Sequence, residues 1–384
     1  MDKRKAANLI FLISLFLSLA GIVFVYTGSY FWCLRKGAPY TYALKQFLAM
    51  IVGIGLALYI SKKVDYRSVA SEKVLWFLYG LANFLLVFVL IFGKEINNSK
   101  SWIIVGGFSF QPAEVAKVLT ILFVSGYLKY KYYDIQNSWE EFLKFTALSF
   151  VPVILILMEK DLGSSMILTI VIFAVLLVNG IKFRFLVPPL LGGSLLFTLA
   201  VITAPYRLAR IKILFDPMKY YDLGKKYNSY QLVQALISFA KGGLTGVGIG
   251  QGTQTKYFFL TFGFSDFIFS HIGEEVGALG ALIVILAYFA ILFLGFLIAE
   301  KSDETIGKSM ATGLSLYIFL EAMVHIGVNL GLIPTTGITL PFMSLGGSSL
   351  IASFLAVGFL MSIAKNLPPE SKIKIRLRGK GRYA

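Results

Sequence analysis

The residues best suited to chemistry in this chain are charged side chains within one long polar segment, residues 204–272. Asp266 stands among aromatic residues near the end of this segment, and apolar surroundings raise a carboxyl pKa towards values that suit a general base. The alternative role for Asp266 is a helix N-cap, because aspartate is a common capping residue and an apolar run follows. Glu274 and Glu275 lie about two helical turns further on, and Glu274 is a candidate supporting residue.

Two arginines stand near the start of the same segment. Arg207 and Arg210 are three residues apart, so on a helix they share a face, and Lys212 is nearby. The planar guanidinium group binds phosphate oxygens through paired N–H donors and stays charged at any relevant pH. The pair is therefore a candidate site for a phosphate-bearing substrate, with anchoring to lipid phosphates as the alternative.

A second pair of charges, Glu114 and Lys117, lies at the start of an apolar run that opens with Pro112. Proline suits the first turn of a helix, and a separation of three residues lets the two side chains pair. Charged groups this close to a bilayer are costly and face a partner or a polar cavity. Two interpretations stay open: a self-satisfied pair that fixes helix packing, or a pair lining a cavity for a charged head group.

Asp161 lies in the short connection between two apolar runs, residues 159–163. Its type and place favour a cap for the helix that follows, and an indirect part in shaping a site is the other interpretation. A zinc site is disfavoured, because the chain has one cysteine, Cys33, and its two histidines, His271 and His325, are far apart.

The glycine-rich run over residues 241–252 looks like a nucleotide-binding loop at first sight. It lacks the Gly-Lys-Ser or Gly-Lys-Thr ending and the strand–loop–helix context of such a loop, which argues against nucleotide binding. Its glycines instead predict a tight, re-entrant backbone that lines a cavity.

The elements that position these residues are predicted to be membrane helices. The chain of 384 residues is 57% hydrophobic and 15% charged, whereas about 25% of residues are charged in a typical soluble domain. A span needs about 20 mostly apolar residues. Ten runs qualify, of which the fifth and sixth form a tight hairpin: residues 7–27, 43–60, 74–92, 112–128, 145–158, 164–180, 185–203, 275–299, 309–332 and 347–364. We therefore predict one all-α polytopic membrane domain over residues 1–384.

The distribution of lysine and arginine predicts the orientation of the chain. With the N-terminus inside the cell, 21 basic residues fall in the short cytoplasmic loops and termini, and 6 in the opposite short loops. This asymmetry places both termini in the cytoplasm and the large 204–272 loop outside it. The net charge of +16 indicates contact with anionic lipid rather than nucleic acid. The basic tail, residues 365–384, is either a strip that binds membrane or a partner, or a solvated tail.

Together these segments resemble the SEDS family of peptidoglycan glycosyltransferases, the FtsW and RodA proteins. The matching stretches span most of the chain in the order of the family: Trp102-Ile103, Phe110–Lys117, Asp161-Leu162-Gly163, Tyr206-Arg207 with Arg210, Asp216-Pro217, Tyr230-Gln231, Ser265–Phe269, Glu274-Glu275, Asn329–Pro334, Leu340-Pro341-Phe342 and Gly346–Ser349. Ten spans with both ends inside agree with what the family implies. Residues 111–114, Lys45-Gln46 and residues 334–341 make the chain more similar to FtsW than to RodA.

The resemblance implies an enzyme of the bacterial inner membrane that polymerises lipid II, a disaccharide-peptide on undecaprenyl diphosphate, during septal synthesis. Asp266 is then the base for the acceptor hydroxyl, and Arg207, Arg210 and Lys117 supply cations for the diphosphate. Glu114, Asp161 and Glu274 are supporting residues. A divalent cation, Mg²⁺ or Mn²⁺, could assist at the diphosphate, although no dedicated site is visible.

Partners implied by the resemblance are a class B penicillin-binding transpeptidase and other division proteins. Three alternatives stay open: an elongation-type polymerase of the same chemistry, a lipid II flippase, and a scaffold that only recruits division proteins. The chain also departs from the family pattern. Thr261 and Phe262 follow Leu260 where the family has Pro-Glu, Ser265 replaces a threonine, and Lys160 replaces a proline. The missing glutamate puts a role for that position in doubt and leaves Asp266 in place.

Overall fold

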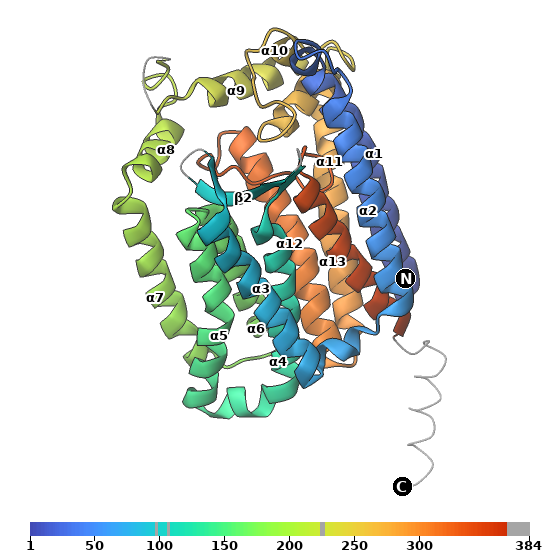
Figure 1. Cartoon of the computed structure of the whole chain (residues 1–384), viewed down its shortest axis with the longest axis vertical. Coiled ribbons are helices and arrows are strands. Elements are labelled where there is room, and N and C mark those ends of the chain that lie inside the picture. The colour runs from blue at the N-terminus through green and yellow to red at the C-terminus, as the bar shows by residue number, and fades with distance from the viewer. Residues whose placement is uncertain (97–98, 106–107, 223–226, 367–384) are drawn as a thin grey trace.

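The structure, a computed structural model, describes residues 1–96, 99–105, 108–222 and 227–366. Over these residues, ten helices of 17–33 residues form an elongated bundle (Figure 1). They are α1 (Lys3–Leu34), α2 (Thr41–Lys63), α3 (Glu72–Phe92), α4 (Pro112–Asn137), α5 (Trp139–Met158), α6 (Leu162–Val178), α7 (Phe183–Ile202), α11 (Ile268–Glu300), α12 (Thr305–Asn329) and α13 (Gly347–Asn366). Each predicted span overlaps one of these helices, so the predicted polytopic helical fold is confirmed.

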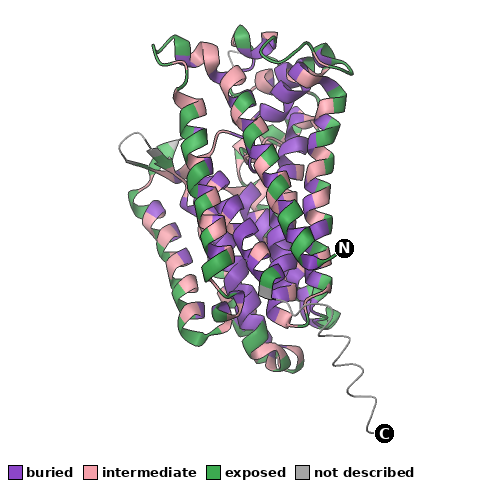
Figure 2. Ribbon diagram, turned by 90° about the vertical axis from the view of Figure 1, so that its right-hand side faces the viewer, coloured by how far each residue is buried: buried purple, intermediate pink, exposed green. Residues whose placement is uncertain are grey.

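Burial separates the centre of the bundle from its edge. Eight helices in the described part of the chain are long and apolar enough to cross a membrane; α6 is apolar but has 17 residues, and α4 carries buried charges. Most of α12 and α13 is buried, and Figure 2 shows that the buried residues gather in the middle of the bundle. By contrast α7 buries Phe185 and Leu186 and otherwise stays exposed at the edge. The site residues on α4 and α12 therefore lie in the protein interior.

The two described ends of the chain lie at the same end of the bundle. The Arg4 guanidinium donates to the Lys365 carbonyl at 3.4 Å, and Lys301 Nζ donates to the Met1 carbonyl at 2.8 Å. An even number of crossings requires this arrangement, and the cytoplasmic placement of both termini stays a prediction. Of the predicted basic tail, residues 365–384, the part after Asn366 lies outside the described residues.

A small antiparallel sheet connects α3 to α4, which the all-α prediction did not include. Its strands, in the order β1-β2-β3, are β1 (Lys94–Ile96), β2 (Ser99–Val105) and β3 (Phe108–Phe110). Trp102 opposes Lys94, and Ile103 opposes Phe110. The Ser99 hydroxyl donates to the Glu159 carbonyl at 2.5 Å, so the sheet is fixed to the α5–α6 turn. A hairpin of this length is too short to give a clear alternating pattern in the sequence.

The 204–272 loop is itself folded. It forms α8 (Pro205–Phe215), α9 (Tyr230–Gly242) and α10 (Thr253–Lys256). In Figure 1, α9 and α10 lie across one end of the bundle, and α8 continues upward from α7. The loop therefore brings polar residues to the end of the bundle opposite the described chain ends.

The eighth predicted span begins too late. We predicted residues 275–299, whereas α11 begins at Ile268 and is interrupted at Gly277, which has a φ of 68°. In the sequence, the two charged residues Glu274 and Glu275 interrupt the apolar run, so the predicted span did not include residues 268–274. Both side chains are buried, however, and accept hydrogen bonds from backbone N–H groups of residues 250–254. The end of the predicted loop is thus the first segment of α11, residues 268–276.

The glycine-rich run fills the break in α11. Four backbone hydrogen bonds of 2.9–3.1 Å join the two segments: Val247 N to Glu274 O, Gly248 N to Glu275 O, Ala278 N to Gly243 O, and Leu279 N to Leu244 O. A Cβ atom on Gly277 would lie 2.4 Å from Gly246 N, and one on Gly246 would lie 2.2 Å from the Glu275 carbonyl oxygen. Glycine is required because the two backbones touch. The prediction of a tight backbone is confirmed.

Candidate active site

The two predicted phosphate-binding arginines lie on α8. Arg207 Nη1 donates to the Ala200 carbonyl, and Arg210 Nη1 donates to the Thr335 carbonyl, each at 2.7 Å. Both guanidinium carbons lie over the Tyr206 ring, at 5.2 and 5.8 Å from its centroid. Each carbonyl contact uses one nitrogen of a guanidinium fork that carries five N–H donors. Helix α8 thus holds two cations side by side, with donors left for an anion.

Asp266 lies in the turn just before α11 and is partly exposed. Loss of solvent around the turn raises the pKa of Asp266 to about 6, and the positive charge of Arg210 acts in the opposite direction. Loss of solvent also lowers the pKa of Arg210, and the charge of Asp266 is among those that oppose this shift. The charges at the two ends of the 204–272 loop, Arg210 on α8 and Asp266 before α11, therefore act on each other.

Asp266 does not cap α11, so that alternative is wrong. The N-cap residue is Phe267, and the helix start receives no side-chain cap. The backbone carbonyl of Asp266 instead accepts a hydrogen bond from Asn329 Nδ2 at 3.0 Å. Asn329 Oδ1 accepts from Ser270 N at 3.0 Å and from Ser270 Oγ at 2.8 Å. One buried amide at the end of α12 thus fixes both Asp266 and the first turn of α11.

The position of the missing glutamate is taken by Phe262. The Phe262 side chain is a hydrocarbon, so it supplies no polar group to the site, and the residue is 46% exposed. Its carbonyl accepts from Ser265 N and Phe267 N, both at 3.1 Å. Thr261, where the family has proline, uses its N–H and hydroxyl to bind the Gln231 side chain at 3.2 and 3.0 Å. The turn that carries Asp266 is therefore built from backbone and amide contacts.

Lys117 lies in a buried ion-pair cluster between α4 and α12. Its Nζ is fully buried, binds Glu114 Oε1 at 2.9 Å, and makes a second ion pair with Glu321. It also lies 5.4 Å from the Tyr317 ring centroid. The packing interpretation of the Glu114–Lys117 pair is favoured. Glu321 was not among the predicted site residues, and its signal in the sequence is a single acid within the apolar run of α12.

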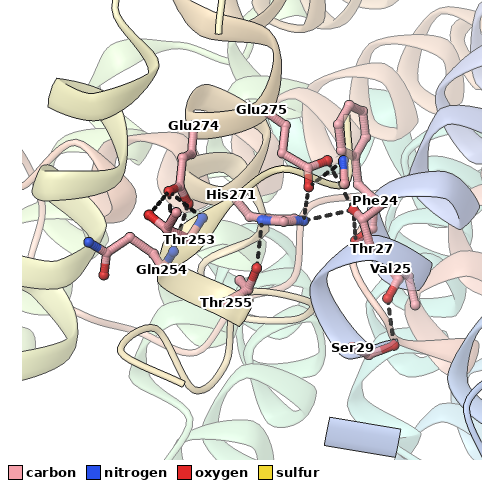
Figure 3. A network of polar contacts seen from close by, with 11 residues as sticks. Phe24, Val25, Thr27, Ser29, Thr253, Gln254, Thr255, His271, Glu274 and Glu275 are labelled. Atoms are coloured by element: carbon pink, nitrogen blue, oxygen red, sulfur yellow. Dashed lines mark hydrogen bonds and ion pairs between the residues drawn. The ribbon is translucent and has the colours of Figure 1, made fainter. Parts of the chain in front are cut away.

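Asp161 and Glu274 each have a capping role. Asp161 accepts from Ser164 N at 2.9 Å as the N-cap of α6, and its charge also acts on Arg210. The cap predicted for Asp161 is confirmed. Glu274 accepts from Thr253 N at 2.8 Å and from Gln254 N at 3.2 Å, and so holds the start of α10 (Figure 3). Each acid therefore fixes the start of one helix, α6 by Asp161 and α10 by Glu274.

Glu159 is a buried carboxyl group that was not among the predicted site residues. It is completely buried at the end of α5, and neither of its carboxyl oxygens has a hydrogen-bond partner among the described residues. Burial, together with the nearby charge of Asp161, raises the pKa of Glu159 to about 9, and Lys117 opposes this shift. Glu159 is therefore protonated at neutral pH.

We expect Glu159→Gln to raise the melting temperature of the purified protein near pH 8. The carboxyl group has a pKa of about 4.3 in an unfolded chain, so the folded state retains a proton that the unfolded state loses. Stability therefore falls as pH rises from about 4.3 towards the folded pKa of about 9. A neutral amide of the same shape removes this loss and should gain about 1–3 kcal/mol near pH 8.

The measurement is a series of thermal melts in detergent between pH 4.5 and 8.5. Glu72→Gln, at an exposed position that begins α3, is the matched control and should follow the parent protein. A gain for Glu159→Gln that is the same at both ends of the pH range would contradict the assignment of a buried, protonated carboxyl group.

The predicted Mg²⁺ or Mn²⁺ would need oxygen ligands at the site. Among the described residues, no group of three or more histidine, cysteine, aspartate or glutamate side chains is placed to hold a metal ion. A cation at this site would therefore need most of its oxygen ligands from a bound diphosphate and water, as Mg²⁺ commonly has. It stays a prediction.

The chain was compared with known proteins. A family model described as cell cycle protein, for FtsW, RodA and SpoVE, matches residues 7–368. The chain is 38% identical over 332 residues to a probable peptidoglycan glycosyltransferase FtsW of Hydrogenovibrio crunogenus, which covers 86% of this chain and 83% of that protein. It is 34% identical over 366 residues to the stage V sporulation protein E of Bacillus subtilis, with 94% and 98% covered.

A solved structure agrees with these relatives. The chain matches a component of a peptidoglycan synthase complex that coordinates polymerization and crosslinking, with a TM-score of 0.73 and 28% identity. The match covers 92% of this chain and 97% of that component, so it includes the helical bundle together with the folded loop. Sequence and fold lead to the same conclusion: the chain belongs to the FtsW, RodA and SpoVE family of polytopic membrane proteins.

Proposed function

We propose that this protein is a peptidoglycan glycosyltransferase that polymerises lipid II during septal cell-wall synthesis. Relatives named peptidoglycan glycosyltransferase FtsW support this activity. The observation that carries the proposal is the convergence of Arg210 and Asp266, from opposite ends of one loop, close enough for each charge to act on the other. Such a pair offers a base for a hydroxyl beside a cation for a diphosphate.

The proposed reaction is a single displacement at the anomeric carbon of the donor sugar. The acceptor hydroxyl oxygen forms the new bond to this carbon, the bond to the diphosphate oxygen breaks, and the configuration inverts. Asp266 takes the hydroxyl proton, since a pKa of about 6 leaves it ionised at neutral pH yet basic enough for the transfer. Arg207 and Arg210 stabilise the negative charge that develops on the departing diphosphate.

The other predicted site residues have supporting parts in this proposal. Lys117 and Glu114 fix α4 against α12, because Lys117 is enclosed by two carboxylates and fully buried. Asp161 and Glu274 hold the α6 start and the α10 start beside the site. A divalent cation would add positive charge at the diphosphate, bound mainly through phosphate oxygens.

The protein is a multi-pass membrane protein of this family. We place it in the bacterial inner membrane with α8, α9 and α10 on the extracytoplasmic side, which the charge asymmetry of the short loops supports. Its proposed partners are a class B penicillin-binding transpeptidase and other division proteins. The structural relative from a peptidoglycan synthase complex supports such a partner, and FtsW relatives support division over elongation.

The direct test is polymerisation of lipid II by the purified protein, with and without a transpeptidase partner. We expect glycan chains that lengthen with time and that depend on lipid II as donor. Absence of glycan in both conditions, with lipid II still carried across the membrane of proteoliposomes, would instead establish a transporter. Absence of both activities would leave the scaffold interpretation.

A further inference from the structure

A buried polar cluster joins α1 to the first segment of α11 (Figure 3). Thr27 Oγ1 lies 2.8 Å from His271 Nε2 and 3.0 Å from Glu275 Oε2, and His271 Nε2 lies 3.5 Å from Glu275 Oε1. His271 is 0% exposed and Glu275 is 1% exposed. We call these three residues the Thr27–His271–Glu275 cluster. No step of the proposed reaction uses it.

The hydrogen bonds in this cluster run in one direction. Thr27 has one hydroxyl proton, and the Glu275 carboxylate at 3.0 Å is a nearer and stronger acceptor for it than the Phe24 carbonyl at 3.4 Å. With the proton directed to Glu275, the Thr27 oxygen accepts from the Nε2–H of His271. The other ring nitrogen, Nδ1, then accepts from the Thr255 hydroxyl at 3.4 Å. The arrangement assigns a neutral histidine with its proton on Nε2. It also makes Thr27 the one residue that links the histidine to the carboxylate through a hydroxyl group.

The cluster ties three segments of the chain together. Thr27 belongs to α1, and Thr255 belongs to α10. The Glu275 Oε1 atom accepts from Gly250 N at 2.9 Å, which adds the glycine-rich run. All three therefore meet on the segment of α11 over residues 268–276, which the break at Gly277 separates from the rest of the helix.

The same short segment carries the proposed base. Asp266 comes directly before it, and Asn329 binds both the Asp266 carbonyl and Ser270 from the α12 side. The Thr27–His271–Glu275 cluster holds the segment from the α1 side. Because the segment is cut off from the long part of α11, these lateral contacts replace the rigidity that a continuous helix would give. Small displacements of a reacting group cost up to about 10²-fold in rate.

We propose that the Thr27–His271–Glu275 cluster positions Asp266 for proton transfer by fixing residues 268–276 to α1. The inference rests on the proposed function and adds a role to residues outside the reacting groups. Within the described part of the chain, the polar contacts of the cluster do not include Arg207 or Arg210, so we expect the cluster to affect the catalytic step and to leave donor binding intact. Thr27, His271 and Glu275 are thus positioning residues.

The test is Thr27→Val, which keeps the side-chain volume and removes the hydrogen bonds to His271 and Glu275. We expect kcat for lipid II polymerisation to fall about tenfold with KM unchanged, and Thr27→Ser to restore kcat because it restores the hydroxyl. The matched control is Thr169→Val on α6, whose partly buried hydroxyl donates to the Ser165 carbonyl at 2.8 Å and should leave kcat unchanged.

Glu275→Gln is the second variant, in case Thr27→Val does not yield folded protein. It keeps an oxygen acceptor for Gly250 N and removes the negative charge of the group that accepts the Thr27 hydroxyl proton. We therefore expect the same fall in kcat. Unchanged kcat, or a rise in KM at constant kcat, in folded Thr27→Val or Glu275→Gln protein overturns the inference. Asp266→Asn, measured in parallel, separates the two questions: if it stays active, the proposed base is wrong whatever the cluster variants show.

Discussion

Polymerisation of lipid II by the purified protein is expected to fall by about 10²–10⁴-fold when Asp266 is replaced by asparagine, the range for loss of a general base. Asparagine keeps the shape of the side chain and cannot take a proton from the acceptor hydroxyl. The turn should survive the change, because Asn329 binds the carbonyl of residue 266 and not its side chain. The measurement is glycan formed per unit time at saturating lipid II.

Two comparisons make this result specific. Asp303→Asn, at an exposed position in the α11–α12 connection, should retain full activity. Lipid II binding by Asp266→Asn should persist, since the arginines on α8 are untouched. Normal glycan output from the Asp266 variant would remove the base assignment. Retained flipping together with full loss of polymerisation would show that the residue serves bond formation and that a flippase alone does not describe the protein.

The pKa of the Asp266 carboxyl group should set the acidic limb of the pH profile of kcat/KM. A base acts in its ionised form, and the pKa of Asp266 is raised to about 6 by loss of solvent. We expect kcat/KM to be constant above this value and to fall tenfold per pH unit below it. The profile should be recorded with and without a transpeptidase partner. A limb centred near 4, the ordinary value for aspartate, would contradict the solvent-poor environment assigned to the turn.

Hydropathy predicted the bundle because a membrane span needs one long apolar run, and each run is local in sequence. The Arg207–Arg210 pair and the Asp161 cap were predictable for the same reason, since three-residue spacing and capping are local rules. The start of α11 was missed because the acids at its second turn bind backbone N–H groups of residues 250–254. Those partners lie about 20 residues earlier, and no local pattern connects them.

Long-range pairs account for the other omissions. Glu321 binds Lys117 across 204 positions, and Thr27 binds Glu275 across 248. A lone acid in an apolar run signals that a partner exists, but it does not identify the partner. For the glycine-rich run, the local backbone was predictable and its long-range partner was not. Its composition predicted a tight backbone, whereas the break at Gly277 that receives it depends on a single glycine inside an apolar helix.

Arg210→Ala is expected to lower kcat/KM for lipid II by about 10–100-fold, the value of one charge-assisted hydrogen bond to a phosphate. Part of the loss should appear in KM, because the ground-state diphosphate is already charged. The rest should appear in kcat, because charge builds up on the leaving group. Arg210→Lys should recover part of the activity, since lysine keeps the charge but not the fork. Lys212→Ala, on the same helix and exposed, is the matched control.

A second consequence of Arg210→Ala separates a catalytic cation from one that only anchors lipid. The positive charge of Arg210 lowers the pKa of Asp266 against the effect of lost solvent. Its removal should therefore raise the pKa of Asp266 above 6 and move the acidic limb of the rate profile to higher pH. Lys212→Ala should leave the limb in place. The proposed mechanism requires that the charges of Arg210 and Asp266 act on each other. An acidic limb that does not move in Arg210→Ala would show that they do not, and would contradict the mechanism.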